Sequence, residues 1–397
     1  MTPTSRPLRV VLVVSNLEFG GTQRQVLHLA RALDRRRFET HVCSLSRYLP
    51  LAAATGSAPA VQVVAKASKY DLSVVFRLRR LLLERQADLV HGFLFDAQLA
   101  ARLAGRLARV PLVIDSERNS DYDLRPVQRL AFRLTRGCVD LVVANSRAGA
   151  AFHRRIHGHA EGQYRVVYNG VDTERFRPMP REQVRQQLGF TPGDRVAGIF
   201  ASFKPQKNHV LFFKAAARVL RDQPALRLLV VGDELAGGLR NSHDHKLRVS
   251  RLVDELGLRD RCLFVGNRQD PERLYNACDV VVLPSLHEGT PNVLLEALAC
   301  GIPALATDVG DNAHVLAHEN GGLVVPSGDE VRLADALARL LGDAALRARL
   351  SSRGRRRILE NFSLESLGAE MGRVYEAGWL ARTSPAVLAT GALPAPR

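Results

Sequence analysis

Short apolar runs alternate with amphipathic stretches along almost the whole chain. The apolar runs are rich in Val, Leu and Ile, as buried strands are, and the stretches between them repeat apolar positions at helical spacing. In the first half we expect strands at residues 10–14, 40–45, 89–92, 112–115 and 141–144, and helices at residues 22–33, 73–85, 97–107 and 125–136. This alternation predicts a parallel sheet covered by helices on both faces.

A second series of the same kind follows. We expect its strands at residues 196–200, 228–231, 263–266, 280–283, 304–307 and 323–325, and its helices at residues 208–221, 244–256, 271–277 and 292–300. Two series predict an α/β protein with two doubly wound, Rossmann-like domains.

Prolines at 178 and 180 interrupt a polar stretch between the two series and indicate a domain boundary. We therefore expect an N-terminal domain at residues 1–180 and a C-terminal domain at residues 181–363. A helix at residues 364–382 and a disordered tail at residues 383–397 follow.

The composition is that of a soluble globular protein, with 46% apolar and 24% charged residues among 397. No apolar run approaches the roughly 20 residues that cross a bilayer, and the first run, at 10–14, is too short for a signal peptide. The five cysteines are scattered and form no CxxC pair. This argues against a disulfide framework or a zinc site and favours a cytoplasmic protein.

The net charge is unusual, at +16. Residues 1–180 carry 28 Lys and Arg against 15 Asp and Glu, whereas residues 181–397 carry 28 against 25. The basic first half is compatible with nucleic acid, an anionic membrane or a phosphorylated substrate, and an arginine-rich, GC-biased genome explains it as well. Only 6% of residues are aromatic and no nucleic-acid-binding motif occurs, so no nucleic-acid partner is expected.

Two junctions of the second series carry candidate chemistry, because ligands of open α/β sheets bind at the carboxyl ends of strands. In "FASFKPQKNHV", Lys204 and Lys207 stand beside a helix start and could bind a diphosphate, although a solvated loop is an equal alternative. In "SLHEGTPNVLLEALACG", Glu288 precedes a helix that contains Glu296. The unpaired N–H groups of that helix favour phosphate. The two acids would then bracket a nucleotide sugar, one at the sugar and one at the ribose.

Two features of the first half are weaker candidates. In "SNLEFGGTQRQ", Gly20 and Gly21 let a backbone approach an anion at a helix start, or form a simple tight turn. Glu117 and Arg118 follow a strand in "VIDSERNSD". His91 lies at the end of another strand, and a lone histidine at a strand end more often has a structural role than a functional one.

The combined motifs resemble the family 4 retaining glycosyltransferases. "HEGTPNVLLEALACGIPALATDVG" is similar to their EGxxxxxxE signature and "SFKPQKN" to their lysine-bearing phosphate loop. "FGGTQRQVLHLARAL", "ANSRA" and "VVYNGVDTERFRP" resemble their landmarks in the N-terminal and interdomain regions. The resemblance extends over residues 8–380 and implies a GT-B fold, with two Rossmann-like domains facing across a cleft.

The resemblance also implies roles. Glu288 and Lys207 would be catalytic, holding the donor sugar and stabilising the departing diphosphate. The donor would contact residues of both junctions, namely Gly289, Thr290, Pro291, Asn292, Val293, Glu296, Ser202 and Lys204. The acceptor side would comprise Gly20, Gly21, His91, Glu117 and Arg118. Transfer would retain the anomeric configuration with no metal and no cofactor, the nucleotide sugar being a substrate.

The chain departs from the family pattern at three places, one of which is the turn after Val231, where "GDELAGG" stands in place of a compact GDGP. Ser202 stands where many members have an arginine, so Lys204 is the candidate replacement, and "DSERN" stands where many have a histidine. The expected enzyme transfers a sugar, from UDP in preference to GDP, to a glycan or polyprenyl-linked acceptor in cell-surface polysaccharide synthesis. Contact with the inner face of an anionic membrane would come from "SVVFRLRRLLLERQ" and "PVQRLAFRLTRG". A GT-B-like epimerase or phosphorylase is the alternative enzyme, and a basic nucleic-acid-binding protein is the alternative of another class.

Overall fold

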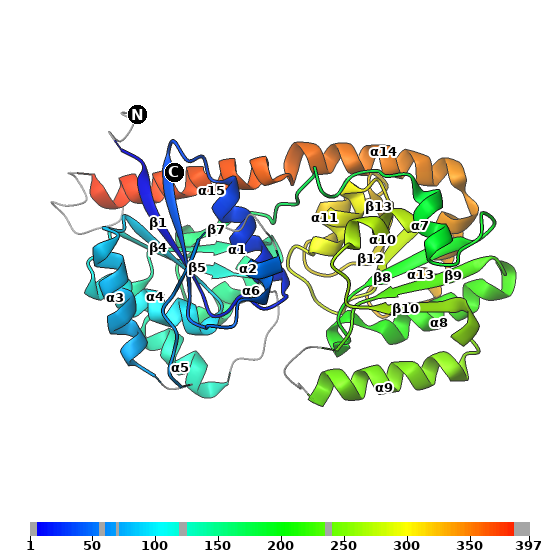
Figure 1. Cartoon of the computed structure of the whole chain (residues 1–397), viewed down its shortest axis with the longest axis horizontal. Coiled ribbons are helices and arrows are strands. Elements are labelled where there is room, and N and C mark those ends of the chain that lie inside the picture. Colours follow the sequence, from blue (N-terminus) through cyan, green and yellow to red (C-terminus); the bar gives the residue numbers. More distant parts are fainter. Residues whose placement is uncertain (1–5, 55–59, 69–70, 119–124, 235–239, 385–397) are drawn as a thin grey trace. The chain divides into compact units, whose positions relative to one another are not determined.

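The structure is a computed structural model that describes residues 6–54, 60–68, 71–118, 125–234 and 240–384. Its contacts divide the chain into two compact units (Figure 1). Unit 1 comprises residues 1–170 and 364–397, and unit 2 comprises residues 171–363. The sequence places the boundary at Pro180 and treats the last helix separately. In the structure the division follows Gly170, and the last helix returns to unit 1.

Unit 1 is built on a parallel sheet with the strand order β3-β2-β1-β4-β5-β6-β7. Its described strands are β1 (Leu8–Val14), β2 (Phe38–Ser44), β3 (Val61–Val63), β4 (Leu89–Phe93), β5 (Leu112–Glu117), β6 (Leu141–Ala144) and β7 (Tyr164–Val166). The central strands β1, β4 and β5 are buried except at Arg9, which is why they read as mainly apolar runs.

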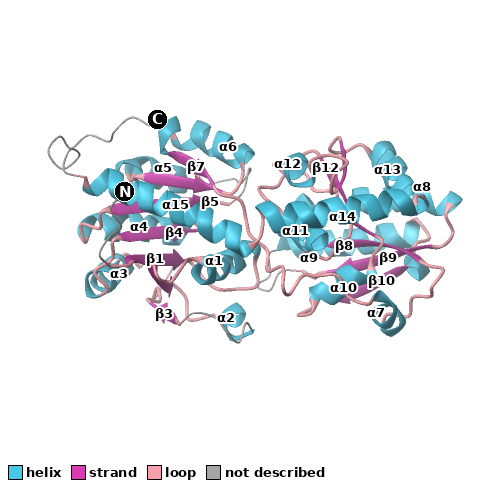
Figure 2. Ribbon diagram, turned by 90° about the horizontal axis from the view of Figure 1, so that it is seen from above, coloured by secondary structure: helices cyan, strands magenta, loops and turns pink. Residues whose placement is uncertain are grey.

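Helices cover both faces of this sheet (Figure 2). They are α1 (Gly21–Ala32), α2 (Pro50–Ala54), α3 (Ser73–Glu84), α4 (Phe95–Leu107), α5 (Pro126–Leu134), α6 (Arg147–His157) and α15 (Leu364–Thr383). One apolar core joins the sheet to α1 and α15, and a second core on the opposite face joins it to α3 and α4.

The C-terminal helix α15 belongs to the first of these cores. Leu367, Met371 and Tyr375 are buried in it. Gly368 allows close contact with α1, since a Cβ there would lie 2.1 Å from the carbonyl oxygen of Ala32. Unit 1 is therefore built from two separate segments of the chain, and unit 2 lies between them in the sequence.

Unit 2 contains a second parallel sheet, with the order β10-β9-β8-β11-β12-β13. Its described strands are β8 (Arg195–Phe200), β9 (Leu226–Val231), β10 (Cys262–Gly266), β11 (Val280–Leu283), β12 (Ala304–Thr307) and β13 (Gly322–Val325). Its helices are α7 (Arg181–Gln187), α8 (His209–Asp222), α9 (Arg240–Glu255), α10 (Pro271–Ala277), α11 (Asn292–Ala299), α12 (Asn312–Leu316), α13 (Glu330–Gly342) and α14 (Ala344–Asn361).

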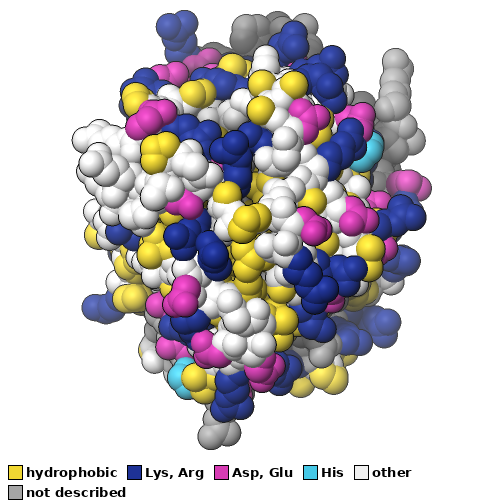
Figure 3. Space-filling view, turned by 90° about the vertical axis from the view of Figure 1, so that its right-hand side faces the viewer, with side chains coloured by type: hydrophobic (Ala, Val, Ile, Leu, Met, Phe, Trp, Pro, Cys, Tyr) yellow, Lys and Arg dark blue, Asp and Glu magenta, His cyan; other side chains and the backbone are white. Residues whose placement is uncertain are grey.

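These two parallel sheets with flanking helices confirm the predicted fold class. The sequence did not predict the short strands β3 and β7, the short helices α2, α7 and α12, or the polar helix α6. The predicted tail at residues 383–397 lies, apart from its first two residues, outside the described residues. Among the described helices, none is both long enough and apolar enough to cross a membrane. Acidic and basic side chains are interspersed on the face shown in Figure 3.

Candidate functional site

The strand order of unit 2 reverses between β8 and β11. From β8 the chain proceeds to β9 and β10 on one side, and then returns to place β11, β12 and β13 on the other. Ligands of open α/β sheets bind at such a switch point, beyond the carboxyl ends of the strands. The loops that follow β8 and β11 are the two that the sequence singles out in this half of the chain.

The loop after β8 presents its lysines on a short, fixed turn. Residues Pro205–Lys207 form a 3-10 turn, and Asn208 follows in the left-handed conformation. The side chain of Asn208 accepts a hydrogen bond from the amide of Leu211 and so caps α8. This cap stabilises the helix start and fixes the position of Lys207 immediately before it.

The loop after β11 is joined to this turn by an ion pair and two hydrogen bonds. Lys207 Nζ lies 2.5 Å from Glu288 Oε1. Gln206 Nε2 donates to the carbonyl oxygen of His287 at 2.7 Å, and the amide of Leu286 donates to the carbonyl oxygen of Gln206 at 2.8 Å. The structure thus brings together the two predicted catalytic residues.

Glu288 is 7% exposed, and its orientation is fixed by a second contact. Ser285 Oγ donates to Glu288 Oε1 at 2.7 Å, and the carbonyl oxygen of Ser285 accepts from Thr307 Oγ1 at 2.6 Å. The carboxylate is therefore anchored to both β11 and β12.

Lys204 is a second cation at the same place. Burial lowers the pKa of Lys204, with Lys207 acting in the same direction and the Glu288 carboxylate opposing both. Two lysines and one carboxylate leave this cluster a net positive charge, which suits an anionic ligand. Ser202 lies two residues before Lys204, and its carbonyl oxygen accepts from the Lys204 amide at 2.7 Å.

The remaining predicted donor-binding residues lead into α11. Gly289, Thr290 and Pro291 are buried, and Asn292 and Val293 form the first turn of the helix. Pro291 occupies the N-cap position and supplies no side-chain cap. The helix N-terminus, which is the positive end of the helix dipole, therefore directly follows the loop whose Glu288 contacts Lys207.

Glu296 lies one turn inside α11 and is 6% exposed. Tyr275 Oη donates to Glu296 Oε2 at 2.8 Å, and the Tyr275 ring stacks on Phe200 at 3.9 Å between centroids. Tyr275 therefore orients this carboxylate. The sequence reasoning missed Tyr275, because its partner lies 21 residues further along.

In unit 1 the strand order reverses between β1 and β4. Gly20 is the N-cap of α1 in the loop after β1, and Gly21 is the first residue of the helix. No side chain caps this helix start. The two glycines thus lie at the switch point of their own sheet, in the position that favours anion binding.

His91 lies in the interior of unit 1 and is fully buried. Its Nδ1 is 2.7 Å from Tyr375 Oη on α15, and burial holds its pKa well below the ordinary value. A neutral histidine that joins β4 to α15 has a clear structural role. Its predicted acceptor-side role stays a prediction.

Glu117 is the last residue of β5, Arg118 follows it, and the two side chains face different surroundings. The guanidinium of Arg118 lies 5.7 Å from the centroid of Phe93, and burial lowers its pKa to about 10. Among the described residues, Nε and Nη1 of Arg118 have no hydrogen-bond partner.

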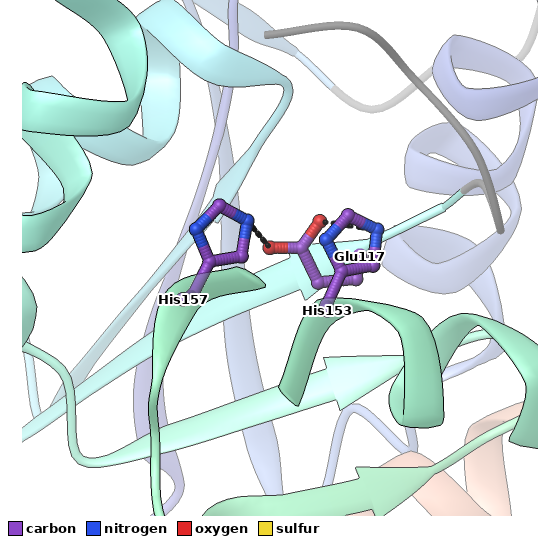
Figure 4. Close-up of side chains that lie close together, drawn as sticks. All are labelled: Glu117, His153 and His157. Carbon is purple, nitrogen blue, oxygen red and sulfur yellow. Dashed lines mark ion pairs between the residues drawn. The ribbon is translucent and has the colours of Figure 1, made fainter. Parts of the chain in front are cut away.

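Glu117 instead contacts His153 and His157, which point toward it from α6 (Figure 4). The sequence reasoning missed both histidines, although their spacing of four residues was a readable signal.

Comparison with known proteins assigns the family. The chain matches the model described as Glycosyltransferase Family 4 over residues 19–175 and the model described as Glycosyl transferases group 1 over residues 180–357. The chain belongs to the family 4 glycosyltransferases. These two matches meet close to the boundary between the units.

Proteins similar to this chain include a D-inositol 3-phosphate glycosyltransferase of Nocardia farcinica, which is 36% identical over 51% of the chain and 45% of the relative. Another is the lipopolysaccharide core biosynthesis mannosyltransferase LpsB of Rhizobium meliloti, 31% identical over 60% of the chain and 66% of the relative. The chain thus spans about half to two thirds of the length of these relatives.

Among solved structures, HepE of Anabaena has a TM-score of 0.81 at 22% identity, covering 93% of this chain and all of HepE. Its likeness supports the GT-B fold.

The position of Glu288 depends on a close approach at Gly310. This glycine has φ +57°, and a Cβ there would lie 2.2 Å from the carbonyl oxygen of Glu288. Gly310→Ala should lower the free energy of unfolding by about 1–2 kcal/mol for the left-handed conformation and by a further ~1–3 kcal/mol for displacing the loop. Gly328→Ala is the matched control, since Gly328 has φ +80° and open space around it. Urea unfolding followed by circular dichroism measures the free energy of unfolding of both variants. Equal losses in the two variants would contradict a close approach between Gly310 and the backbone of Glu288.

Proposed function

We propose that this chain is a retaining glycosyltransferase that uses a nucleoside-diphosphate sugar, with UDP favoured over GDP. The acceptor is a hydroxyl group of a glycan or lipid-linked intermediate in cell-surface polysaccharide synthesis. The observation that carries the donor half of the proposal is the contact between Lys207 and Glu288 across the switch point of unit 2.

The cationic loop and the helix start provide what a departing diphosphate requires. Negative charge develops on the leaving diphosphate in the transition state, and donors already aimed at that charge lower the barrier. Lys207, Lys204 and the N-terminus of α11 would supply them. Once phosphate binds Lys207, Glu288 would be released to accept hydroxyl groups of the sugar, and Glu296, held by Tyr275, would accept those of the ribose. This chemistry requires neither a metal ion nor a further cofactor.

The names of related proteins support the choice of substrates. A relative from Escherichia coli, 26% identical over 74% of the chain and 76% of the relative, is a UDP-Gal:alpha-D-GlcNAc-diphosphoundecaprenol alpha-1,3-galactosyltransferase. HepE has been solved in complexes with UDP and with UDP-glucose. These names and complexes guide the choice of ligands for the tests.

Arg118 supports an acceptor that carries phosphate. A buried guanidinium without a carboxylate partner among the described residues is unfavourable unless a ligand supplies the negative charge. Both the inositol 3-phosphate and the diphosphoundecaprenol in the names of the relatives are phosphate-bearing. We therefore assign Arg118 to the acceptor phosphate.

A membrane contact would follow from a lipid-linked acceptor, and α5 supplies a suitable surface. Val127, Leu130 and Leu134 on this helix are 76%, 55% and 76% exposed, and the helix also carries Arg129 and Arg133. An exposed apolar stripe flanked by arginines is typical of helices that lie on an anionic bilayer. We propose that unit 1 binds the inner face of the membrane, with the enzyme in the cytoplasm. The five free cysteines fit that compartment.

The donor half is tested by release of nucleoside diphosphate from UDP-, GDP- and ADP-sugars in the presence of EDTA. We expect release from one donor, reduced roughly 10²–10³-fold in Glu288→Gln and in Lys207→Met. Asp254→Asn is the control, because Asp254 forms an exposed ion pair with Arg259 elsewhere in unit 2. Full activity in Glu288→Gln would contradict the proposal, as would a strict need for a metal ion in protein that circular dichroism shows to be folded in EDTA. Product analysis separates transfer from epimerisation and phosphorolysis.

The acceptor half is tested by calorimetric binding of inositol 3-phosphate to protein saturated with UDP. Arg118→Gln should weaken binding at least about tenfold, the effect of losing a charged hydrogen bond. Arg155→Gln, an exposed arginine on α6, should leave it unchanged. Equal affinities in the wild type and in Arg118→Gln would remove Arg118 from the acceptor site.

The membrane contact is tested by sedimentation with phosphatidylcholine vesicles that contain or lack phosphatidylglycerol. The wild type should sediment with the anionic vesicles and should be released by salt. Leu134→Glu should reduce binding, whereas Leu359→Glu, at an exposed leucine of α14 in unit 2, should not. Equal binding to the two kinds of vesicle would contradict an electrostatic contact.

A further inference from the structure

Unit 1 contains a buried cluster of two histidines and one glutamate that the proposed sugar transfer does not use. Glu117 Oε2 lies 3.3 Å from His153 Nε2, and Glu117 Oε1 lies 4.0 Å from His157 Nε2 (Figure 4). One donor atom from each of the three side chains lies within 4.8 Å of the others. All three side chains are at most 4% exposed.

Local structure explains how these residues meet. Glu117 is the last residue of β5 and pairs with Ala144 at the end of β6, just before α6 begins. Ser146 caps α6 by accepting from the amide of Gly149, and Gly158 ends it in the left-handed conformation. Residues four apart on such a helix lie on one face. The two imidazole rings are accordingly stacked, 5.3 Å between centroids and 4° between planes.

The cluster has the donor set of a transition-metal site. Two imidazole nitrogens and one carboxylate oxygen are a common set of protein ligands for Zn²⁺, at about 2.0–2.2 Å from the ion. Around a tetrahedral ion such ligand atoms are roughly 3.3 Å apart. The distance from His153 Nε2 to Glu117 Oε2 already has this value, and the three ligand atoms of the cluster all lie within 4.8 Å of one another.

The cluster is enclosed by its surroundings, which suits a bound cation. The side chains of Glu117, His153 and His157 are all buried. A metal ion binds the neutral form of imidazole through the lone pair of a ring nitrogen. Arg102 and Asp115 neutralise each other nearby, in an ion pair that is almost completely buried.

The surroundings resemble the outer shell of a metal site. Phe132 packs against His157 at 4.9 Å between ring centroids, and Phe152 packs against His153 at 5.2 Å. An apolar shell of this kind excludes water and strengthens the binding of a metal to its ligands.

We propose that Glu117, His153 and His157 bind one divalent transition-metal ion of the zinc class inside unit 1. The ion joins the end of β5 to α6 and stabilises unit 1, next to Arg118. It takes no part in the chemistry of the donor, whose candidate residues belong to unit 2. The sequence reasoning expected no zinc site because the cysteines are scattered, and it did not consider ligands made of histidine and glutamate alone.

The experiment uses the full chain, stripped of metal with a chelator and then titrated with Zn²⁺ and with Co²⁺. We expect one equivalent bound per chain, a visible absorption spectrum of Co²⁺ in a tetrahedral site, and a rise in Tm with metal. Glu117→Gln and His157→Asn should weaken binding at least about 100-fold, since loss of an outer-shell partner alone costs 10–100-fold.

The control is His243→Ala. His243 forms an exposed pair with Glu234 in unit 2, so this change removes a histidine beside a glutamate without touching the cluster. It should bind one equivalent with unchanged affinity. The Co²⁺ spectrum of the wild type tests the proposal even if a variant fails to fold. Absence of a stoichiometric site in the wild type would overturn the proposal, as would equal affinity in wild type and cluster variants.

Discussion

The ion pair between Lys207 and Glu288 is the contact on which the candidate donor site depends. It joins two loops that are 81 residues apart in the sequence, and it can form because β8 and β11 are neighbours in the sheet of unit 2. A parallel sheet places the carboxyl ends of its strands at one edge, so the loop after each strand opens onto the same side. The lysines, Glu288 and the start of α11 are gathered there by topology rather than by closeness in sequence.

Several residues serve this arrangement without being candidates for contact with a substrate. Ser285 and Thr307 anchor Glu288, Gly310 makes room for its backbone, and Tyr275 orients Glu296. In unit 1 the same kind of support comes from α15, which the chain adds last. The site residues are therefore held by contacts between segments that lie far apart in the sequence, and substitutions well away from the two motifs should affect them.

The sequence predicts the central strands well because they are buried on both faces and read as mainly apolar runs. The predicted strands at residues 280–283, 304–307 and 141–144 coincide with β11, β12 and β6. Helix α6 escaped prediction because "AGAAFHRRIHGHA" places histidines at positions that a core helix fills with apolar residues. Its buried cluster was missed with it.

The sequence predicted the residues of the candidate donor site but not the contacts between them. Glu288 and Lys207 could be named from their loops, yet their contact could not, because it requires knowledge of which strands are neighbours. The partner of Glu296 was hidden for the same reason, since Tyr275 comes from a different helix. A buried acid in an apolar helix indicates a partner, and only the packing of α10 against α11 identifies it.

The central claim is that the loops after β8 and β11 form one site for a nucleoside diphosphate. Hydrogen–deuterium exchange of the full chain with and without UDP tests it directly, because it reports on both loops in a single experiment. The account predicts slower exchange in residues 202–211 and in residues 285–296, with the other described segments of unit 2 unchanged. Protection of only one of the two loops, or of neither, would contradict it.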